Sequence, residues 1–210
     1  LTLDQPITAT QSAMSGLSAD GSTAGIKAGE VLTVEQLLQC MLIVSANEAC
    51  NILGETLCGS VDAFVARMNE RAKELGMNDT HFVNCTGLPA DGHVTSAYDI
   101  ALMSRELIWR HPDIRRFTTI WMDSLRGGAS MLVNTNKLVR FYPGATGLKT
   151  GSTDSAKYCI SATAEKDGME LIAVILGGST SDKRFSDAKA LLNYGFAAYS
   201  LVTVLSLIHI

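Results

Sequence analysis

Hydrophobic residues recur at intervals of three and four along the first half of the chain, which is the spacing of amphipathic helices. Four helices are predicted, and three of them follow a residue whose side chain can cap the first turn. They begin after Thr33, at Asn47, after Ser60 and after Ser96. Gly76 stands where a left-handed glycine ends the third helix, and Pro112 ends the fourth. Asp99, three residues after the serine that caps the fourth helix, predicts a capping box.

The pattern after Pro112 is that of β structure. Residues 117–121 place large apolar side chains in a run rich in threonine, and residues 158–164 and 169–176 are apolar or alternating. Lys166-Asp167-Gly168 lies between the last two segments and favours a hairpin turn. We therefore expect these two strands to pair antiparallel.

Helical spacing returns over residues 181–198, where the apolar face includes Phe185, Leu191 and Leu192. Residues 1–30 are rich in serine, threonine, alanine and glycine, which indicates loop with short strands. Helices, then strands, then a helix predict an α+β domain in which helices cover a mostly antiparallel sheet. Neither an internal repeat nor a long linker marks a second domain.

The composition narrows the classes of function. Of 210 residues, 47% are hydrophobic and 18% are charged, which is the balance of a folded globular domain. The net charge of −4 offers no basic field for nucleic acid. The apolar runs are far shorter than the roughly 20 residues of a membrane-spanning helix. Five cysteines without a CxxC pair and four scattered histidines predict no metal site, and we expect the cysteines to be small buried hydrophobes.

Two short strings could carry chemistry. A chain of this composition is expected to contain Ser-x-Asn about 0.7 times by accident, but Lys-Thr-Gly only about 0.06 times. Ser45-Ala46-Asn47 lies between two apolar helices, where polar side chains need partners. Lys149-Thr150-Gly151 comes just before an apolar strand and follows Gly144 and Gly147, so that backbone or ligand can approach closely.

These strings resemble signatures of the penicillin-recognising serine acyl-transferases, which carry Ser-x-x-Lys, Ser-x-Asn and Lys-Thr-Gly. Within that group the sequence is similar to the low-molecular-mass D-alanyl-D-alanine carboxypeptidases. The resemblance covers residues 20–199 and implies a β-lactamase/transpeptidase-like fold with a helical subdomain. The segments that carry it are residues 45–50, 75–82, 86–88, 96–101, 141–144 and 147–151.

The resemblance implies acyl transfer, in which a serine attacks the peptide carbonyl between two D-alanines and water later releases the acyl-enzyme. Ser45 would relay a proton to the departing amine, since a hydroxyl can donate and accept at once. Asn47 would hold the substrate carbonyl or the catalytic lysine. Lys149 would supply positive potential for the oxyanion and the substrate carboxylate. The substrate-binding residues implied are Thr150, Gly151, Ser152 and Arg184, whose planar guanidinium suits a terminal carboxylate.

The first signature of the group is missing from its expected place. Residues 1–44 contain no Ser-x-x-Lys, and only Ser186-Asp187-Ala188-Lys189 has that spacing. That stretch falls on the amphipathic closing helix, so we interpret it as accidental. Because the chain begins without methionine, we expect residues 1–199 to be a partial catalytic domain that lacks its nucleophile and is inactive. Residues 200–210 are a tail of uncertain origin.

The partners implied are peptidoglycan pentapeptides ending in D-Ala-D-Ala, with β-lactams as inhibitors, and a membrane only through a missing C-terminal anchor. The resemblance places such a protein outside the cytoplasmic membrane, and its chemistry requires no metal or organic cofactor. Two alternatives remain open. One is a β-lactamase of the same fold, which needs a carboxylate to activate water. The other is a non-catalytic domain that binds peptidoglycan or penicillin.

Overall fold

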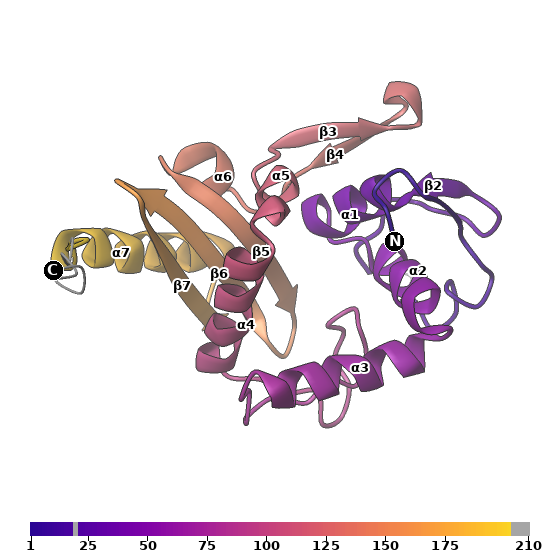
Figure 1. Ribbon diagram of the computed structural model, residues 1–210, viewed down its shortest axis with the longest axis horizontal. Helices are drawn as coiled ribbons and strands as arrows, with labels where there is room; N and C mark the ends of the chain where they lie inside the picture. The colour runs from indigo at the N-terminus through magenta and orange to yellow at the C-terminus, as the bar shows by residue number, and fades with distance from the viewer. Residues whose placement is uncertain (19–20, 203–210) are drawn as a thin grey trace, which may run out of the picture.

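The computed structural model describes residues 1–18 and 21–202, so most of the predicted tail, 203–210, lies outside the described residues. A helical part lies beside a three-stranded sheet, and a β-hairpin projects next to both (Figure 1). The helices are α1 (Val34–Ile43), α2 (Asn47–Cys58), α3 (Val61–Glu74), α4 (Ala97–Arg110), α5 (Arg115–Thr118), α6 (Leu138–Phe141) and α7 (Ser181–Ala198). The strands are β1 (Pro6–Thr8), β2 (Val31–Thr33), β3 (Met122–Leu125), β4 (Ser130–Val133), β5 (Ala145–Thr153), β6 (Lys157–Lys166) and β7 (Met169–Gly178).

The helical part begins at a capping box. Thr33 Oγ1 accepts from the Gln36 amide at 3.2 Å, and Gln36 Oε1 accepts from the Thr33 amide at 2.9 Å. Helix α1 then packs against α2 and the short β1–β2 sheet around the fully buried Leu37, Ile43 and Ile52. This cluster is the core under the Ser-x-Asn motif.

Ser60 and Ser96 cap α3 and α4 as predicted. The predicted capping box at Asp99 is wrong, because its carboxylate accepts instead from the Asp79 amide at 2.8 Å and the Thr80 hydroxyl at 2.7 Å. Asp99 is only 1% exposed. The buried carboxylate therefore bonds to the loop before the helix and not to the helix terminus.

The predicted hairpin between β6 and β7 is confirmed. Lys166 pairs with Met169, and the two residues between them, Asp167 and Gly168, have φ of 52° and 79°. Positive φ at both positions is what a two-residue type I′ turn requires. The complete sheet has the order β5-β6-β7 with antiparallel pairing throughout, so β5 is an edge strand in the described part of the chain.

Helices cover both faces of this sheet (Figure 1). Successive residues of β6 face opposite sides. Ala162 belongs to the cluster packed under α7, whereas the Ser161 hydroxyl lies 2.7 Å from that of Ser104 on α4. Met103 of α4 is 37% exposed, because the face that meets the sheet is the one carrying Ser104. Leu191 of α7 is likewise 49% exposed, contrary to prediction.

The β structure predicted over residues 117–121 is wrong. Phe117 lies in α5, and β3 begins only at Met122. Pro112 starts a 3₁₀ turn that leads into α5, and Phe117 and Thr118 are then buried where α5 packs on α1 and β5. Tertiary packing decides the local structure here, against the β propensity of the segment.

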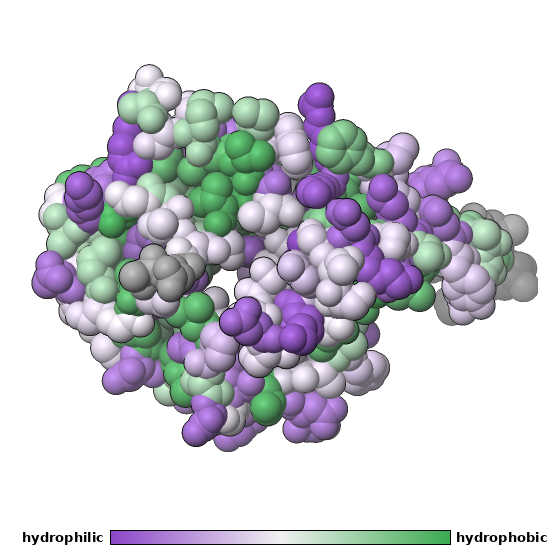
Figure 2. All heavy atoms as spheres, turned by 180° about the vertical axis from the view of Figure 1, so that it is seen from behind, coloured by the Kyte–Doolittle hydropathy of each residue, from purple (hydrophilic) through white to green (hydrophobic). Residues whose placement is uncertain are grey.

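The surface carries few large apolar areas. Met122, Met131 and Val133 are exposed on one face of the β3–β4 hairpin, and hydrophobic side chains gather near that hairpin in the view from behind (Figure 2). No helix among residues 1–18 and 21–202 is long and apolar enough to cross a membrane. All five cysteines are free. Cys40 lies fully buried in the helical core, but Cys50, Cys58, Cys85 and Cys159 are only partly buried, so the expectation of buried cysteines is wrong for these four.

Candidate active site

Ser45 lies at the sharp turn between α1 and α2. Its φ of 63° is in the left-handed region, where a residue other than glycine is strained. The Ala46 amide closes the turn by donating to the Cys40 carbonyl at 3.0 Å. Such strain persists only where the surrounding structure enforces it, and it clusters at functional positions. The fold therefore holds Ser45 at a fixed point beyond the end of α1.

Asn47 is the first residue of α2 and is 6% exposed. Its backbone amide donates to the Ser22 carbonyl at 2.9 Å. Its side chain lies against Gly21, where an added Cβ would stand 2.6 Å from Asn47 Nδ2. The loop 21–26 therefore packs directly on the third residue of the Ser-x-Asn motif.

Lys149 extends from the edge strand β5 toward this turn. Its Nζ donates to Ser45 Oγ at 2.9 Å and to the Thr150 carbonyl at 2.7 Å. Close packing fixes the strand behind it, because an added Cβ at Gly147 would lie 2.8 Å from Thr118 Oγ1. The structure thus brings together two motifs that stand 104 residues apart.

Lys149 loses its proton at a lower pH than an ordinary lysine does. Burial, and to a smaller extent the Arg184 guanidinium, lower the pKa of Lys149 from 10.5 to about 8. Burial also raises the pKa of the nearby Cys50 thiol to about 12, so that thiol is neutral near pH 7 and lends the ammonium little support. A lysine in this state can stabilise an anionic oxygen at Ser45 and can also exchange a proton with it.

The remaining residues predicted on this strand lie along its open edge. Thr150 is 7% exposed, and its hydroxyl lies 2.6 Å from that of Thr135. Gly151 and Ser152 are exposed, and an added Cβ at Gly151 would meet nothing within 4 Å. An extended ligand can therefore approach the strand from Lys149 to Ser152.

Arg184 reaches β5 from α7. Its Nη1 donates to the carbonyls of Gly151 and Cys159, each at 3.1 Å, and its Nη2 donates to Ser181 Oγ at 3.4 Å. The side chain is 6% exposed, its Nε has no partner within the described chain, and burial lowers its pKa. Arg184 therefore places a second positive charge beside the strand that carries Lys149.

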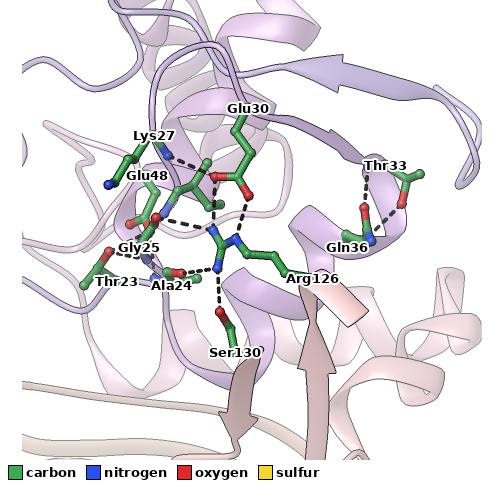
Figure 3. Close-up of polar contacts among 11 residues, drawn as sticks. Thr23, Ala24, Gly25, Lys27, Glu30, Thr33, Gln36, Glu48, Arg126 and Ser130 are labelled. Carbon is green, nitrogen blue, oxygen red and sulfur yellow. Dashed lines mark hydrogen bonds and ion pairs between the residues drawn. The ribbon is translucent and has the colours of Figure 1, made fainter. Parts of the chain in front are cut away.

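Glu48 holds the loop 21–26 against the motif (Figure 3). Its Oε1 accepts from the Thr23 hydroxyl and the Ala24 amide, each at 2.7 Å, and from the Ile26 amide at 3.3 Å. Glu48 is 2% exposed. Because it directly follows Asn47, these bonds fix the loop to the first turn of α2.

Arg126 holds the same loop from the β3–β4 hairpin (Figure 3). Its guanidinium pairs with the Glu30 carboxylate at 2.8 and 3.1 Å and donates to Ser130 Oγ at 2.8 Å. It also donates to the carbonyls of Ala24 at 3.2 Å and Gly25 at 3.3 Å. The loop is thus held on its amide side by one residue and on its carbonyl side by another.

Sequence reasoning assigned no role to Thr135, Glu48 or Arg126. Their contacts are long-range, and no local sequence pattern marks them. Ser186, from the accidental Ser-x-x-Lys, lies on α7 and donates to the Lys183 carbonyl of its own helix. Over the described ranges, no group of three or more His, Cys, Asp or Glu side chains is arranged to hold a metal ion.

The fold matches solved structures of DD-peptidases. The Streptomyces K15 DD-transpeptidase matches with a TM-score of 0.86 and 28% identity, covering 94% of this chain and 80% of that chain. Penicillin-binding protein D2 from Listeria monocytogenes, in its cefotaxime-bound form, matches with a TM-score of 0.82 and 35% identity, covering 93% and 78%. The chain therefore has the α+β fold of the DD-transpeptidases and penicillin-binding proteins, as predicted.

Sequence relatives narrow this class further. A family model described as D-alanyl-D-alanine carboxypeptidase matches residues 1–180. The D-alanyl-D-alanine carboxypeptidase DacF of Bacillus subtilis is 43% identical over 185 residues, which are 87% of this chain and 47% of DacF. DacA of Escherichia coli is 35% identical over 182 residues, 86% of this chain and 44% of DacA. The chain belongs to the D-alanyl-D-alanine carboxypeptidase family, and it spans less than half the length of these two relatives.

Proposed function

We propose that this chain is part of a serine-type carboxypeptidase that removes the terminal D-alanine from peptidoglycan stem peptides through an acyl-enzyme. One observation carries the proposal, the 2.9 Å hydrogen bond from Lys149 Nζ to Ser45 Oγ. A hydroxyl bound to this ammonium can pass its proton to a departing amine, because the ammonium stabilises the oxygen anion left behind. Membership of the family supports the type of reaction.

Substrate binding is assigned to the open edge of β5 and the start of α2. The edge strand offers backbone groups from Thr150 to Ser152 to an extended peptide. Lys149 and Arg184 add positive potential, which favours a ligand that ends in a carboxylate. Asn47 supplies a side-chain amide for the substrate carbonyl.

The nucleophile is assigned to a part of the protein outside this chain. Residues 1–44 contain no Ser-x-x-Lys, so residues 1–199 are proposed to be a partial catalytic domain without turnover of its own. Stem peptides ending in D-Ala-D-Ala would be the substrate and β-lactams the inhibitors, and the protein would act outside the cytoplasmic membrane.

Release of D-alanine tests this proposal. The chain alone is compared with a chimera in which the part of B. subtilis DacF that precedes the matched segment is joined before residue 1. The chimera should release D-alanine from a D-Ala-D-Ala peptide, and Lys149→Ala should lower its kcat/KM at least about 100-fold. Lys73→Ala, at an exposed position on α3, is the matched control. Robust turnover by the chain alone would mean that the nucleophile lies within it.

The same chimera separates the two alternatives. Faster hydrolysis of penicillin than of the peptide would indicate a β-lactamase, whereas a slowly cleared penicilloyl adduct agrees with a carboxypeptidase. Ligand binding without any release of D-alanine would indicate a non-catalytic domain.

A further inference from the structure

A rigid polar turn, Asn134-Thr135-Asn136, follows β4 at the site. Asn134 and Asn136 are 3% and 1% exposed, and their side-chain amides donate to the carbonyls of Ile120 at 2.7 Å and Gly147 at 3.0 Å. Asn134 Oδ1 also accepts from the Asn136 amide at 2.8 Å. Buried amides that are bonded at both the nitrogen and the oxygen fix the backbone around them. Thr135 is therefore held in place by both neighbours while it is itself exposed.

Thr135 contacts both motifs of the site. Its amide donates to the carbonyl of Ile43 at 3.1 Å, two residues before Ser45. Its hydroxyl lies 2.6 Å from the hydroxyl of Thr150, the residue after Lys149. Its backbone is thus tied to the Ser-x-Asn side and its side chain to the Lys-Thr-Gly side.

One hydroxyl proton of the Thr135–Thr150 pair remains free to donate. When two hydroxyls bond to each other, one donates and the other accepts, and the accepting hydroxyl keeps its own proton for a third group. That third group must be a hydrogen-bond acceptor. Lys149 Nζ donates to the Thr150 carbonyl at 2.7 Å and Arg184 Nη1 to the Gly151 carbonyl at 3.1 Å, so two cations act on the same stretch of strand. Positive potential of this kind favours an anionic acceptor.

We propose that Thr135 is a specificity-determining residue that binds, together with Thr150, the terminal carboxylate of the substrate. The inference rests on the function proposed for the site and adds to it a residue outside the family motifs. A hydroxyl donor beside two cations distinguishes a carboxylate from a carboxamide of the same shape, because the carboxamide carries no charge and turns its own donors toward them.

The test measures binding of two ligands to the chain by NMR chemical-shift perturbation. One is a peptide ending in D-Ala-D-Ala with a free carboxylate, and the other is its C-terminal amide. The wild type should prefer the carboxylate about tenfold, the effect of one hydrogen bond to a charged group. Thr135→Val keeps the shape but removes the hydroxyl that orients Thr150, so the preference should fall severalfold, whereas Thr135→Ser should retain it. Thr119→Val removes a hydroxyl that bonds to the Arg115 carbonyl at the end of α5 and is the matched control.

The outcomes separate the two proposals. If the wild type prefers the carboxylate and Thr135→Val keeps that preference, the role of Thr135 is overturned while the proposed function stands. Equal loss in the valine and serine variants would also overturn it, since the serine retains the hydroxyl. If the wild type binds neither ligand, the proposed substrate is wrong and the inference falls with it. Unchanged amide resonances of β5 in Thr135→Val show that the variant remains folded.

Discussion

Lys149 Nζ donates a 2.9 Å hydrogen bond to Ser45 Oγ across 104 residues of sequence. The bond joins the strained turn after α1 to the edge strand β5, so its geometry depends on how the helical part and the sheet are held. The core under α7, the loop 21–26 and the charge on Lys149 each contribute to this geometry. Each of them can be changed by a single substitution.

Leu192→Ala tests the packing of α7 under the sheet. Leu192 is 1% exposed within the cluster that includes Ile160 and Phe185. Its truncation should lower the free energy of unfolding by about 3 kcal/mol, through lost burial and the cavity left behind. Leu191→Ala on the same helix, at a position 49% exposed, should cost less than about 1 kcal/mol. Urea denaturation measures both, and equal losses would contradict the assigned face of α7.

Glu48→Leu tests the anchoring of the loop 21–26. The leucine leaves the Thr23 hydroxyl and the Ala24 and Ile26 amides without their acceptor, so we expect a loss of about 3 kcal/mol. Glu48→Gln should cost much less, because its Oε1 can accept the same three bonds. Chemical denaturation compares the two, with Glu35→Gln as an exposed control. A glutamine variant as unstable as the leucine variant would show that charge, and not the acceptor, matters.

Arg126→Gln should loosen the same loop without unfolding the protein. The change removes the pair with Glu30 and the bonds to the Ala24 and Gly25 carbonyls. Amide hydrogen exchange of Ala24 and Ile26 should become about tenfold faster, since their opening free energy falls by about 1.4 kcal/mol. Unchanged exchange at these two amides would show that the arginine does not hold the loop.

The matched control for this variant is Arg116→Gln. Arg116 forms an exposed pair with Glu35 at 3.4 Å, away from the loop 21–26, so its loss should leave the exchange of both amides unaltered.

Lys149→Met tests the lowered pKa through the pH dependence of stability. Between about pH 8 and pH 10.5 the folded chain binds fewer protons at Lys149 than the unfolded chain does. The contribution of Lys149 to stability should therefore rise with pH across this window, so the wild type should gain relative to Lys149→Met. Cys40 and Cys50 act in the opposite direction above pH 9, because burial raises their pKa to about 12. The effect of Cys40 is common to both proteins and cancels in the difference, whereas Lys149 lowers the pKa of the Cys50 thiol, so both proteins are compared in a Cys50→Ala background. A flat difference in that background would contradict the lowered pKa of Lys149.

Local signals were enough to predict several elements. Ser60 and Ser96 cap helices because their side chains satisfy amides in the next turn, and Asp167-Gly168 forms a hairpin turn because both residues adopt positive φ. The same reasoning fails for residues 117–121, since the burial of Phe117 and Thr118 where α5 packs on α1 and β5 is a tertiary effect. The capping box predicted at Asp99 is a second failure, because the carboxylate accepts from Asp79 and Thr80, which lie about twenty residues before it.

The candidate site shows the same division. Ser45 and Lys149 could be chosen from the sequence because they belong to short strings of recognisable spacing. Thr135 and Arg126 belong to no such string. Arg126 pairs with Glu30 at a separation of 96 residues. Thr135 contacts Thr150 only because two buried asparagines hold its turn beside β5. Contacts of this kind follow from the folded arrangement and have no local pattern.

The most direct test of the shared site is an NMR titration of the Lys149 ammonium in the wild type and in Ser45→Ala. We predict a pKa of about 8 for Lys149 in the wild type and a lower pKa in the variant, because the Ser45 oxygen accepts a hydrogen bond from the charged form and so stabilises it. A pKa near 10.5 that is the same in both proteins would contradict it.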